Sequence, residues 1–377
     1  MSKTDRGRNV KPTIEKCLWG MTAGRCEFQG CNTYLGEHSV TKAEGNFGEK
    51  AHVEAVSEGG ARYKELMPNE ELNSSDNIMI LCPTCHKLID EHPEEYTVDV
   101  LKEMKRTHEL RIYQLTEIDD IQTTLIMNYF ANIESFSPMY EDRLFCRAVI
   151  KNGKVPSNSY SVPIGTENMP FKDGNNSFYI IQEELLNSAR EKIIKPSIKN
   201  EESISLFALA PIPLLIKLGT LFRDISNVTV YQCHRIGEKW AWKKNSNIIE
   251  YQIDKNRNVR SKEVALNISL SAEILQDRID KELGEVCTYK ITIANPNRLF
   301  VENEDVVDEF VKIFRNCMEQ IKNENPEIQA INVFPAMPNS LAVRLGMDYM
   351  PKTDPRLIIY DQVSSETGFI KTIEIGD

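Results

Sequence analysis

The nonapeptide Cys82-Pro83-Thr84-Cys85-His86-Lys87-Leu88-Ile89-Asp90 decides the fold of the N-terminal part of this chain. It contains two cysteines separated by two residues, and a second pair, Cys26 and Cys31, lies upstream, with 50 residues between Cys31 and Cys82. Two such pairs are typical of a tetrahedral zinc site with four thiolate ligands. We therefore expect Cys26, Cys31, Cys82 and Cys85 to bind a structural Zn²⁺, whose binding energy substitutes for part of the core that a small module lacks. The alternative, unpaired buried or redox-active thiols, does not explain the pairing.

Two histidines and an asparagine accompany these cysteines. His52 lies in the short apolar context Ala51-His52-Val53, Asn77 precedes the apolar run 78–81, and His86 follows Cys85 directly. Metal-dependent hydrolysis of a phosphodiester needs a base that activates water, a divalent cation, and a group that fixes the base. We assign His52 as the base, Asn77 as the residue that fixes its backbone, and His86 with Asp90, four residues further along a helix, as ligands of Mg²⁺ or a similar ion. Singly, each residue also fits a structural role, but their joint order favours a phosphodiesterase.

Residues 17–110 resemble the HNH endonucleases. The resemblance rests on the first cysteine pair, on Ala51-His52-Val53, and on the nine-residue step from Asn77 to His86 within the second cysteine motif. It implies an α+β module with a ββα-metal site and a four-cysteine zinc site. Many relatives have an aspartate or histidine ligand directly before the base, where this chain has Ala51. Glu49, Glu54, or water beside His86 and Asp90 are the alternatives for the missing ligand.

The composition of the chain indicates its cellular compartment and how strongly it binds DNA. The 377 residues predict more than one domain, and the polar N-terminus and the absence of a long apolar run predict a cytoplasmic protein that does not bind membranes. Nine cysteines, an odd number, argue against a disulfide framework. The net charge is −11, and residues 1–120 hold 15 Lys and Arg against 22 Asp and Glu. We therefore expect a monomer to bind polyanionic DNA weakly.

The pattern along the chain predicts a nuclease domain in residues 1–120, a connector in residues 121–150, and a sensing domain in residues 151–377. An amphipathic helix over 97–118 closes the first part. From about residue 180, helices alternate with short β-branched runs, which predicts α/β layers. The expected strands are Ile204–Leu209, Val228–Tyr231, Val264–Leu270, Thr288–Ile293, Ala330–Phe334 and Leu357–Tyr360.

An internal repeat with a constant offset of 127 residues runs through the second part. It aligns Pro211 with Pro338 and Gly219 with Gly346 in two copies of a strand, a turn with proline, a short helix and a second strand. Two related α/β halves would place equivalent loops at the C-terminal ends of strands, around a shared crevice. Chance similarity between two strand-turn-helix units is the alternative.

Residues 145–377 resemble the SAVED domain, a fusion of two CARF-like, Rossmann-like halves that binds cyclic oligonucleotides in antiphage systems. The resemblance rests on the segments 207–215 and 334–342, and on His234-Arg235 followed by Trp240-Ala241-Trp242. A cyclic nucleotide needs basic groups for its phosphates and flat groups for its bases. The expected ligand-binding residues are Lys217, Arg235, Trp240, Trp242, Asn339, Ser340 and Arg344. The tryptophans also fit an ordinary apolar strand face, and the basic residues also fit a solvated surface.

Together, these resemblances imply an HNH-SAVED effector of the CBASS type. We expect an endonuclease that degrades double-stranded DNA in abortive infection once a cyclic di- or trinucleotide from a cognate nucleotidyltransferase binds it. We also expect a homo-oligomer that grows on activation, because several weak DNA contacts then act together. One alternative is a constitutive restriction-type HNH nuclease with a DNA-recognition half. That half should be basic, yet residues 121–377 hold 30 Lys and Arg against 34 Asp and Glu. Another is a non-catalytic zinc protein that docks nucleic acid.

Overall fold

The computed structural model divides into two compact units, Met1–Asp120 and Ile121–Asp377. The structure describes residues 10–38, 40–55, 60–63, 68–116, 122–133, 136–158, 160–165, 176–199, 203–243, 249–256, 262–364 and 368–376. The domain boundary that we expected near residue 120 falls on residues 117–121, outside the described residues.

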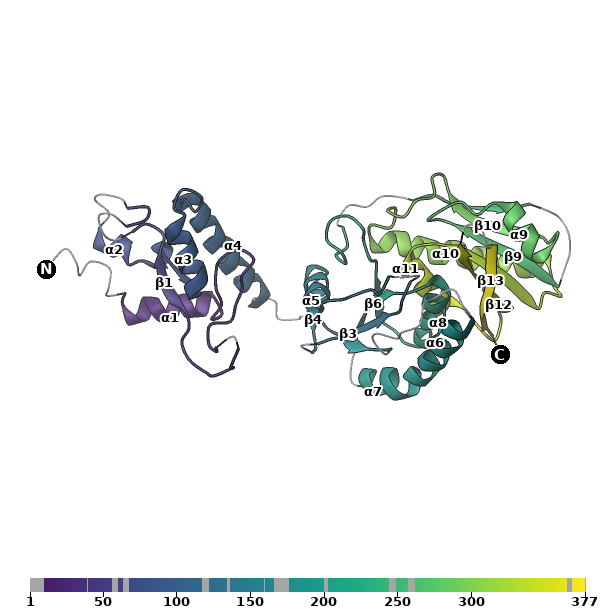
Figure 1. Ribbon diagram of the computed structural model, residues 1–377, viewed down its shortest axis with the longest axis horizontal. Coiled ribbons are helices and arrows are strands. Elements are labelled where there is room, and N and C mark those ends of the chain that lie inside the picture. The colour runs from purple at the N-terminus through teal and green to yellow at the C-terminus, as the bar shows by residue number, and fades with distance from the viewer. Residues whose placement is uncertain are drawn as a thin grey trace. The chain divides into compact units, whose positions relative to one another are not determined.

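The N-terminal unit is built on a two-stranded antiparallel sheet followed by a helix (Figure 1). Its elements are α1 (Pro12–Met21), β1 (Glu49–His52), α2 (Asn69–Leu72), a 3₁₀ turn (Ser75–Asn77), β2 (Ile78–Leu81), α3 (Pro83–Glu91) and α4 (Val98–Thr116). In β2 all four residues are buried, and Leu18, Ile89 and Leu101 from the helices complete this core. The register pairs Glu49 with Leu81 and His52 with Ile78, so the strand that carries His52 lies beside the strand that leads into the second cysteine pair.

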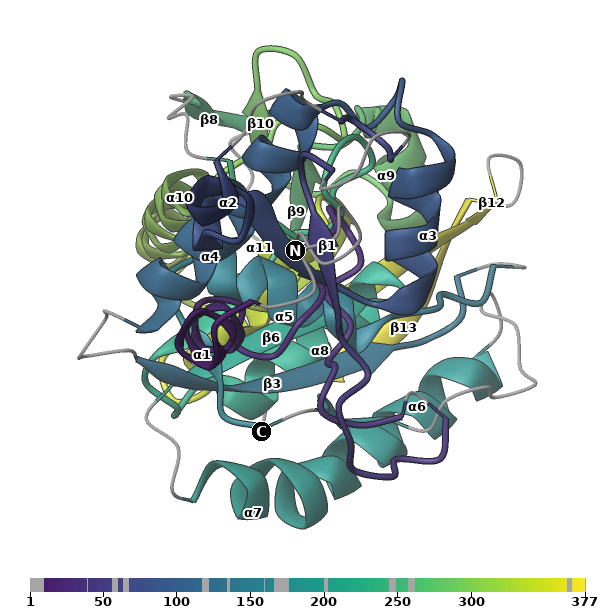
Figure 2. The same cartoon turned by 90° about the vertical axis from the view of Figure 1, so that its left-hand side faces the viewer.

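The C-terminal unit contains two mainly parallel sheets with helices on their faces (Figures 1 and 2). The first sheet has the order β4-β3-β6-β7, with β5 also paired to β3, and the second has the order β13-β12-β11-β9-β10-β8. Its strands are β3 (Thr123–Phe130), β4 (Val155–Pro156), β5 (Val162–Pro163), β6 (Ile204–Leu209), β7 (Val228–Tyr231), β8 (Tyr251–Lys255), β9 (Glu263–Ser269), β10 (Thr288–Ile293), β11 (Ala330–Ala336), β12 (Arg356–Ser364) and β13 (Gly368–Ile375). Its helices are α5 (Asp142–Lys151), α6 (Asn176–Ala189), a π-helical turn (Arg190–Ile194), α7 (Lys195–Ile198), α8 (Ile212–Phe222), α9 (Gln276–Leu283), α10 (Glu304–Glu324) and α11 (Asn339–Asp348). All six strands that the sequence predicts in this unit are present.

The predicted connector, residues 121–150, is wrong as a separate element. Thr123–Phe130 forms β3, which lies between β4 and β6 inside the first sheet. Six of its eight residues are buried, because helices and strands cover both faces of a parallel sheet. Phe145 and Val149 of α5 are also buried, in the aromatic cluster beside this sheet. The segment is therefore an integral part of the second unit.

The 127-residue repeat corresponds to two equivalent structural units. In the first, β6 pairs in parallel with β3 on one side and β7 on the other, and in the second, β11 pairs in parallel with β9 and β12. The helices that follow β6 and β11, α8 and α11, pack against each other. A Cβ atom added to Gly346 would lie 1.9 Å from the carbonyl oxygen of Ile216, and one added to Gly219 would lie 2.0 Å from that of Val343. The paired glycines therefore allow the two backbones to touch where the halves meet.

Candidate functional site

The four predicted zinc ligands converge in the N-terminal unit. Their sulfur atoms all lie within 4.8 Å of one another, and the Sγ atoms of Cys31 and Cys82 are 4.0 Å apart. Zn–S bonds of about 2.3 Å in a tetrahedron place sulfur atoms about 3.8 Å apart, so the cluster has the size that Zn²⁺ needs. Cys26 and Cys31 come from the loop after α1, while Cys82 and Cys85 lie at the start of α3. The four-thiolate site predicted from the spacing thus exists as a cluster that fits the ion.

Hydrogen bonds and burial act in opposite directions on the sulfurs of Cys26 and Cys31. The backbone N–H of Cys82 donates to Sγ of Cys26 (3.3 Å), and that of Cys85 donates to Sγ of Cys82 (3.5 Å). Burial raises the pKa of the Cys26 thiol to about 12 and also raises that of Cys85. At Cys31, burial acts in the same direction but hydrogen bonds from Thr33 outweigh it, and the pKa falls to about 7. Thiolate ligation must therefore release protons from the buried cysteines, which makes metal affinity depend on pH.

Asn77 holds the backbone that follows His52. Its side chain is buried, with 4% exposed, and its Oδ1 accepts the backbone N–H of Glu54 at 2.9 Å. Its Nδ2 donates to the carbonyl oxygens of Glu54 (3.2 Å) and Leu72 (3.1 Å). Two of these bonds hold the backbone of Glu54, two residues beyond His52, and the third holds Leu72, while the catalytic role of Asn77 stays a prediction.

His52 lies half-buried at the end of β1, and its Nε2 is 3.4 Å from Oδ1 of Asn73. Burial lowers the pKa of its imidazole; the contact with Asn73 opposes this shift and the nearby His86 adds to it. The ring therefore stays neutral to lower pH than a free histidine, and a neutral ring is the form that accepts a proton.

His86 lies between two carboxylates. Its Nδ1 is 2.8 Å from Oε2 of Glu49 on β1, and its Nε2 is 3.5 Å from Oδ2 of Asp90 on α3. Among the alternatives for the ligand missing at Ala51, the structure places Glu49 beside His86, whereas the Glu54 carboxylate pairs with Lys102 at 3.3 Å and is buried. Glu49 and Asp90 face opposite nitrogens of the His86 ring, so only Asp90 lies at the nitrogen that it could share with a cation, and Glu49 is placed to orient the ring. Among the described residues, the four cysteines are the group whose ligand atoms converge on one point.

Sequence reasoning missed two residues of this region, Asn73 and Arg62. Asn73 contacts His52, and Arg62 donates from Nη2 to Oδ1 of Asp90 at 3.1 Å. Neither residue belongs to a motif, and both are separated from their partners by about twenty residues or more. No periodicity in the sequence identifies such pairs, because the fold alone brings them together.

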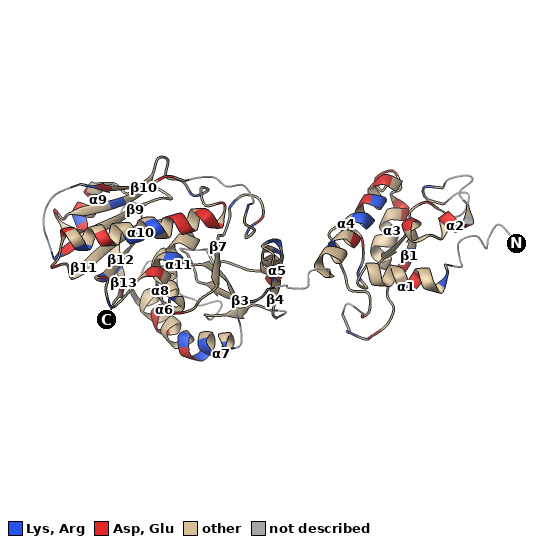
Figure 3. Cartoon of the chain, turned by 180° about the vertical axis from the view of Figure 1, so that it is seen from behind, with Lys and Arg blue, Asp and Glu red and all other residues tan. Residues whose placement is uncertain are grey.

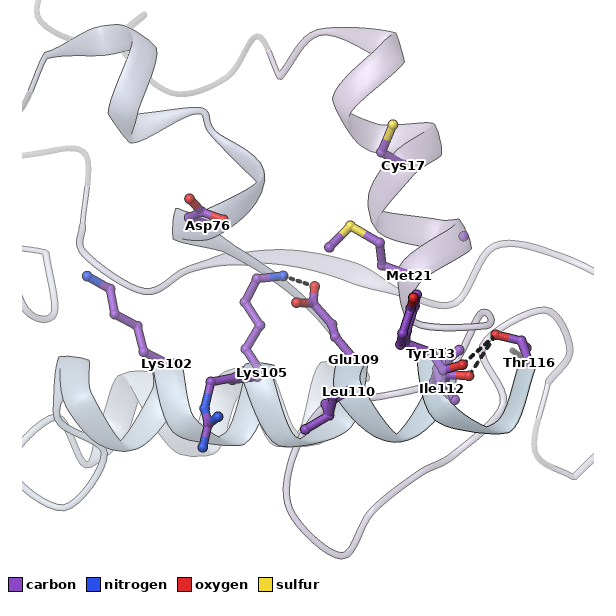
Figure 4. A pocket seen from close by; sticks show the side chains of 12 residues that line it. Cys17, Met21, Asp76, Lys102, Lys105, Glu109, Leu110, Ile112, Tyr113 and Thr116 are labelled. Carbon is purple, nitrogen blue, oxygen red and sulfur yellow. Dashed lines mark hydrogen bonds and ion pairs between the residues drawn. The ribbon is translucent and has the colours of Figure 1, made fainter. Parts of the chain in front are cut away.

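A groove of about 1030 Å³ between α1 and α4 is a separate feature of the N-terminal unit (Figure 4). Cys17 and Met21 of α1 and Leu110 and Tyr113 of α4 form its apolar part. Lys105 and Glu109, which form an ion pair, add charge to its wall. Among the described residues that line it, none is one of the assigned catalytic or zinc-binding residues.

In the C-terminal unit, Lys217 and Arg344 pair with acidic residues of neighbouring helices. Nζ of Lys217 on α8 is 2.8 Å from Oε1 of Glu183 on α6, and Nη2 of Arg344 on α11 is 3.5 Å from Oδ1 of Asp308 on α10. The repeat relates Lys217 to Arg344, and each of these residues has an acidic partner on a neighbouring helix. Each side chain that we expected to bind phosphate therefore already has an acidic partner that ties its helix to the next.

The tryptophans and Arg235 belong to the segment after β7. Trp240 is 2% exposed and packs edge-on against Phe145 and Phe207, at ring distances of 5.7 and 5.3 Å. Its ring belongs to the hydrophobic core, so neither face of the ring is available for stacking on a nucleobase in this structure. Trp242 is half-buried beside Tyr231, whose ring lies 6.2 Å away, and Arg235 is exposed. Of these three predicted ligand contacts, Arg235 and Trp242 retain accessible surface.

Asn339 and Ser340 join the two halves of the repeat. Asn339 Nδ2 donates to the carbonyl oxygens of Ala208 (2.9 Å) and Tyr231 (3.3 Å), at the ends of β6 and β7, and its Oδ1 accepts the N–H of Cys233. Ser340 Oγ donates to Oε1 of Gln232 at 2.7 Å. Both side chains are buried, so their visible role is to connect the N-terminus of α11 to the first sheet rather than to contact a ligand.

In the part of the chain that the structure describes, no helix is both long and apolar enough to cross a bilayer. A comparison with curated proteins finds no match. Among solved structures, the chain is similar to the Acinetobacter baumannii Cap4 SAVED/CARF-domain containing receptor. With the cyclic trinucleotide 2'3'3'-cAAA, that structure is 14% identical, 77% of this chain and 61% of that chain are covered, and the TM-score is 0.42. The structure of the same receptor with 3'3'3'-cAAA is 11% identical to this chain, with 77% of this chain and 62% of that chain covered and a TM-score of 0.41. This chain thus spans about 61% of the receptor's length.

The family comparison concerns the second unit. Residues 186–375 match the model of SAVED, described as the "SMODS-associated and fused to various effectors sensor domain". The match covers half of the chain and includes both copies of the repeat, from β6 to β13. This chain belongs to the SAVED family.

Proposed function

We propose that this protein is a metal-dependent DNA endonuclease of the HNH type, switched on when a cyclic oligonucleotide binds its SAVED region, and that it acts in CBASS-type antiphage defence. The observation that carries the nuclease part is the placement of His52 on β1, Asn77 in the turn that leads into β2 and His86 on α3, on neighbouring elements of the unit that also holds the four-cysteine cluster. The family description, which names a sensor domain fused to various effectors, supports an effector in the N-terminal unit.

The residues divide the chemistry among them. His52, kept neutral by burial, takes a proton from the attacking water, and Asn77 keeps the following backbone in place. His86 and Asp90 would hold a divalent cation such as Mg²⁺, with Glu49 orienting the His86 ring from its other nitrogen, while Cys26, Cys31, Cys82 and Cys85 would hold the structural Zn²⁺. The bound cation supplies charge that stabilises the scissile phosphate and the leaving oxygen.

The net negative charge of the N-terminal unit supports regulation by oligomerisation. Lys and Arg are interspersed with Asp and Glu along α4 (Figure 3), and the first 120 residues carry more acidic than basic side chains. A single copy would therefore hold duplex DNA weakly, and several nuclease units joined by their sensor regions would hold it better. We accordingly propose a homo-oligomer that enlarges when the cyclic nucleotide binds.

The test is cleavage of duplex DNA by the zinc-loaded full chain with Mg²⁺, with and without cyclic di- and trinucleotides. Light scattering on the same samples reports assembly. We expect cutting only with a matching nucleotide, and we expect His52→Ala to abolish cutting without changing nucleotide binding. His92→Ala, which alters an exposed histidine just after α3, is the matched control. Equal cutting without nucleotide would favour the constitutive nuclease, and no cutting with any nucleotide and metal would favour a non-catalytic zinc protein.

A further inference from the structure

A buried arginine connects three segments around the candidate cation site. Arg62 has only 4% of its side chain exposed, whereas its partner Asp90 has 51%. Its Nε donates to the carbonyl oxygen of Val53 (2.8 Å), and its Nη1 donates to those of Ile89 (2.6 Å) and Tyr96 (3.5 Å). Its Nη2 donates to Oδ1 of Asp90 at 3.1 Å.

These contacts join Arg62 to Asp90 and to the backbone of the segments that carry His52 and His86. Val53 directly follows His52, and Asn77 holds the next residue, so Arg62 and Asn77 fix consecutive positions after the base. Ile89 lies in the last turn of α3, where carbonyl groups lack partners within the helix. Asp90 uses Oδ1 for Arg62 and Oδ2 for Nε2 of His86. The guanidinium thus leaves one carboxylate oxygen of Asp90 directed at His86.

We infer that Arg62 is a positioning residue for the divalent cation, acting through Asp90. This inference rests on the proposed nuclease function. A ligand carboxylate that is half exposed can rotate among several orientations, and a fixed hydrogen-bond donor limits it to one.

The geometry requires arginine in particular. The planar guanidinium directs its donors to Val53, Ile89 and Asp90 at once, and a lysine ammonium at the same place is a single point that cannot span them. The backbone of Arg62 has φ of 60°, a left-handed conformation that side chains other than glycine adopt rarely. The contacts of the guanidinium explain why the chain accepts that conformation here.

Binding of Mn²⁺ to the zinc-loaded full chain, measured by titration calorimetry without DNA or nucleotide, tests the inference. Mn²⁺ is the probe because it prefers the same carboxylate and imidazole donors as Mg²⁺ and generally binds them more tightly. We expect Arg62→Lys to raise the dissociation constant by about 10- to 100-fold, the usual effect of losing a residue that orients a ligand. Asp90→Asn should raise it at least as much. The double variant should be no worse than Asp90→Asn alone, because Arg62 acts through Asp90.

Arg106→Lys is the matched control, since Arg106 is exposed on α4 and pairs only with Glu103 among the described contacts. Zinc content and thermal unfolding are measured for every variant. If Arg62→Lys lowers the unfolding temperature but binds Mn²⁺ as tightly as Arg106→Lys, the role is merely structural and the inference fails. Additive effects in the double variant would also overturn it. If the wild-type chain binds no Mn²⁺, the cation site of the proposed function fails first, and the inference falls with it.

Discussion

Replacing Gly346 by alanine should weaken the junction between the two halves of the sensor unit. Gly346 lies on α11 where it crosses α8, and a Cβ there would meet the carbonyl oxygen of Ile216 at 1.9 Å and the Cα of Gly219 at 3.1 Å. Both obstacles are backbone, so no side chain can rotate away. Relief to an ordinary contact of about 3.4 Å requires the helices to separate by about 1.5 Å.

That separation has a calculable consequence for stability. Overpacking of a close-packed contact costs about 1–3 kcal/mol, and a gap of this size removes a further part of the dispersion contacts around it. The buried residues that lose contact include Leu215 and Leu218 on α8 and Leu341 and Leu345 on α11. Alanine recovers about 1 kcal/mol through its higher helix propensity. With the lost dispersion contacts about offsetting this gain, we expect the free energy of unfolding of this unit to fall by about 1–3 kcal/mol.

Guanidinium denaturation followed by tryptophan fluorescence measures this change. Trp240 and Trp242 report the sensor unit, and a Trp19→Phe background removes the signal of the N-terminal unit. Gly20→Ala in α1, followed by circular dichroism, is the control, because nothing lies within 4 Å of its added Cβ and the substitution should stabilise α1 slightly. A fluorescence midpoint for Gly346→Ala equal to that of the parent would refute the argument that the two backbones touch.

Three further results are expected in the N-terminal unit. In a pH–rate profile, DNA cleavage should lose activity on the acid side only below pH 6.5. Burial lowers the pKa of His52 below its ordinary value of 6.5, so the base stays neutral down to a lower pH. A loss of activity that is centred at or above pH 6.5 would contradict this. Asn77→Ala should lower the free energy of unfolding of this unit by about 3 kcal/mol, because it leaves the buried backbone N–H and carbonyl groups of Glu54 unpaired. Thermal melts measure this change, and Asn46→Ala, at an exposed asparagine, is the control that should change the stability little. Removing zinc with a chelator, or Cys82→Ser, should unfold the start of α3, seen as lost ellipticity while Trp240 and Trp242 fluorescence stays constant.

Local spacing predicted much of the candidate site. Two cysteine pairs can reach one ion only if the chain between them folds back, and the apolar run before Cys82 indicates the strand that achieves this. His86 and Asp90 share a helix face because they are four residues apart. The repeat was visible because equivalent units keep their prolines and glycines at equivalent turns and crossings. Zinc binding, catalysis and nucleotide sensing by these residues remain predictions.

The partner of each charged or aromatic side chain was not predictable in this way. Nothing local indicates that Lys217 pairs with Glu183, or that Trp240 belongs to a core with Phe145. The run Thr123–Phe130 was assigned to the connector rather than to the sheet, because a strand buried on both faces loses its alternating pattern.

By itself, the sequence determined the chemical types present and their local order: paired thiols, a histidine before a zinc hairpin, and two copies of an α/β unit. Only the tertiary structure decided which groups meet. It placed Glu49 rather than Glu54 at His86, brought Arg62 to Asp90, and turned Asn339 toward the first sheet. The physical reason is the separation in sequence. Helical and strand periodicity relate residues that are a few positions apart. These contacts join residues that are 28 to 131 positions apart, and packing of each unit brings them together.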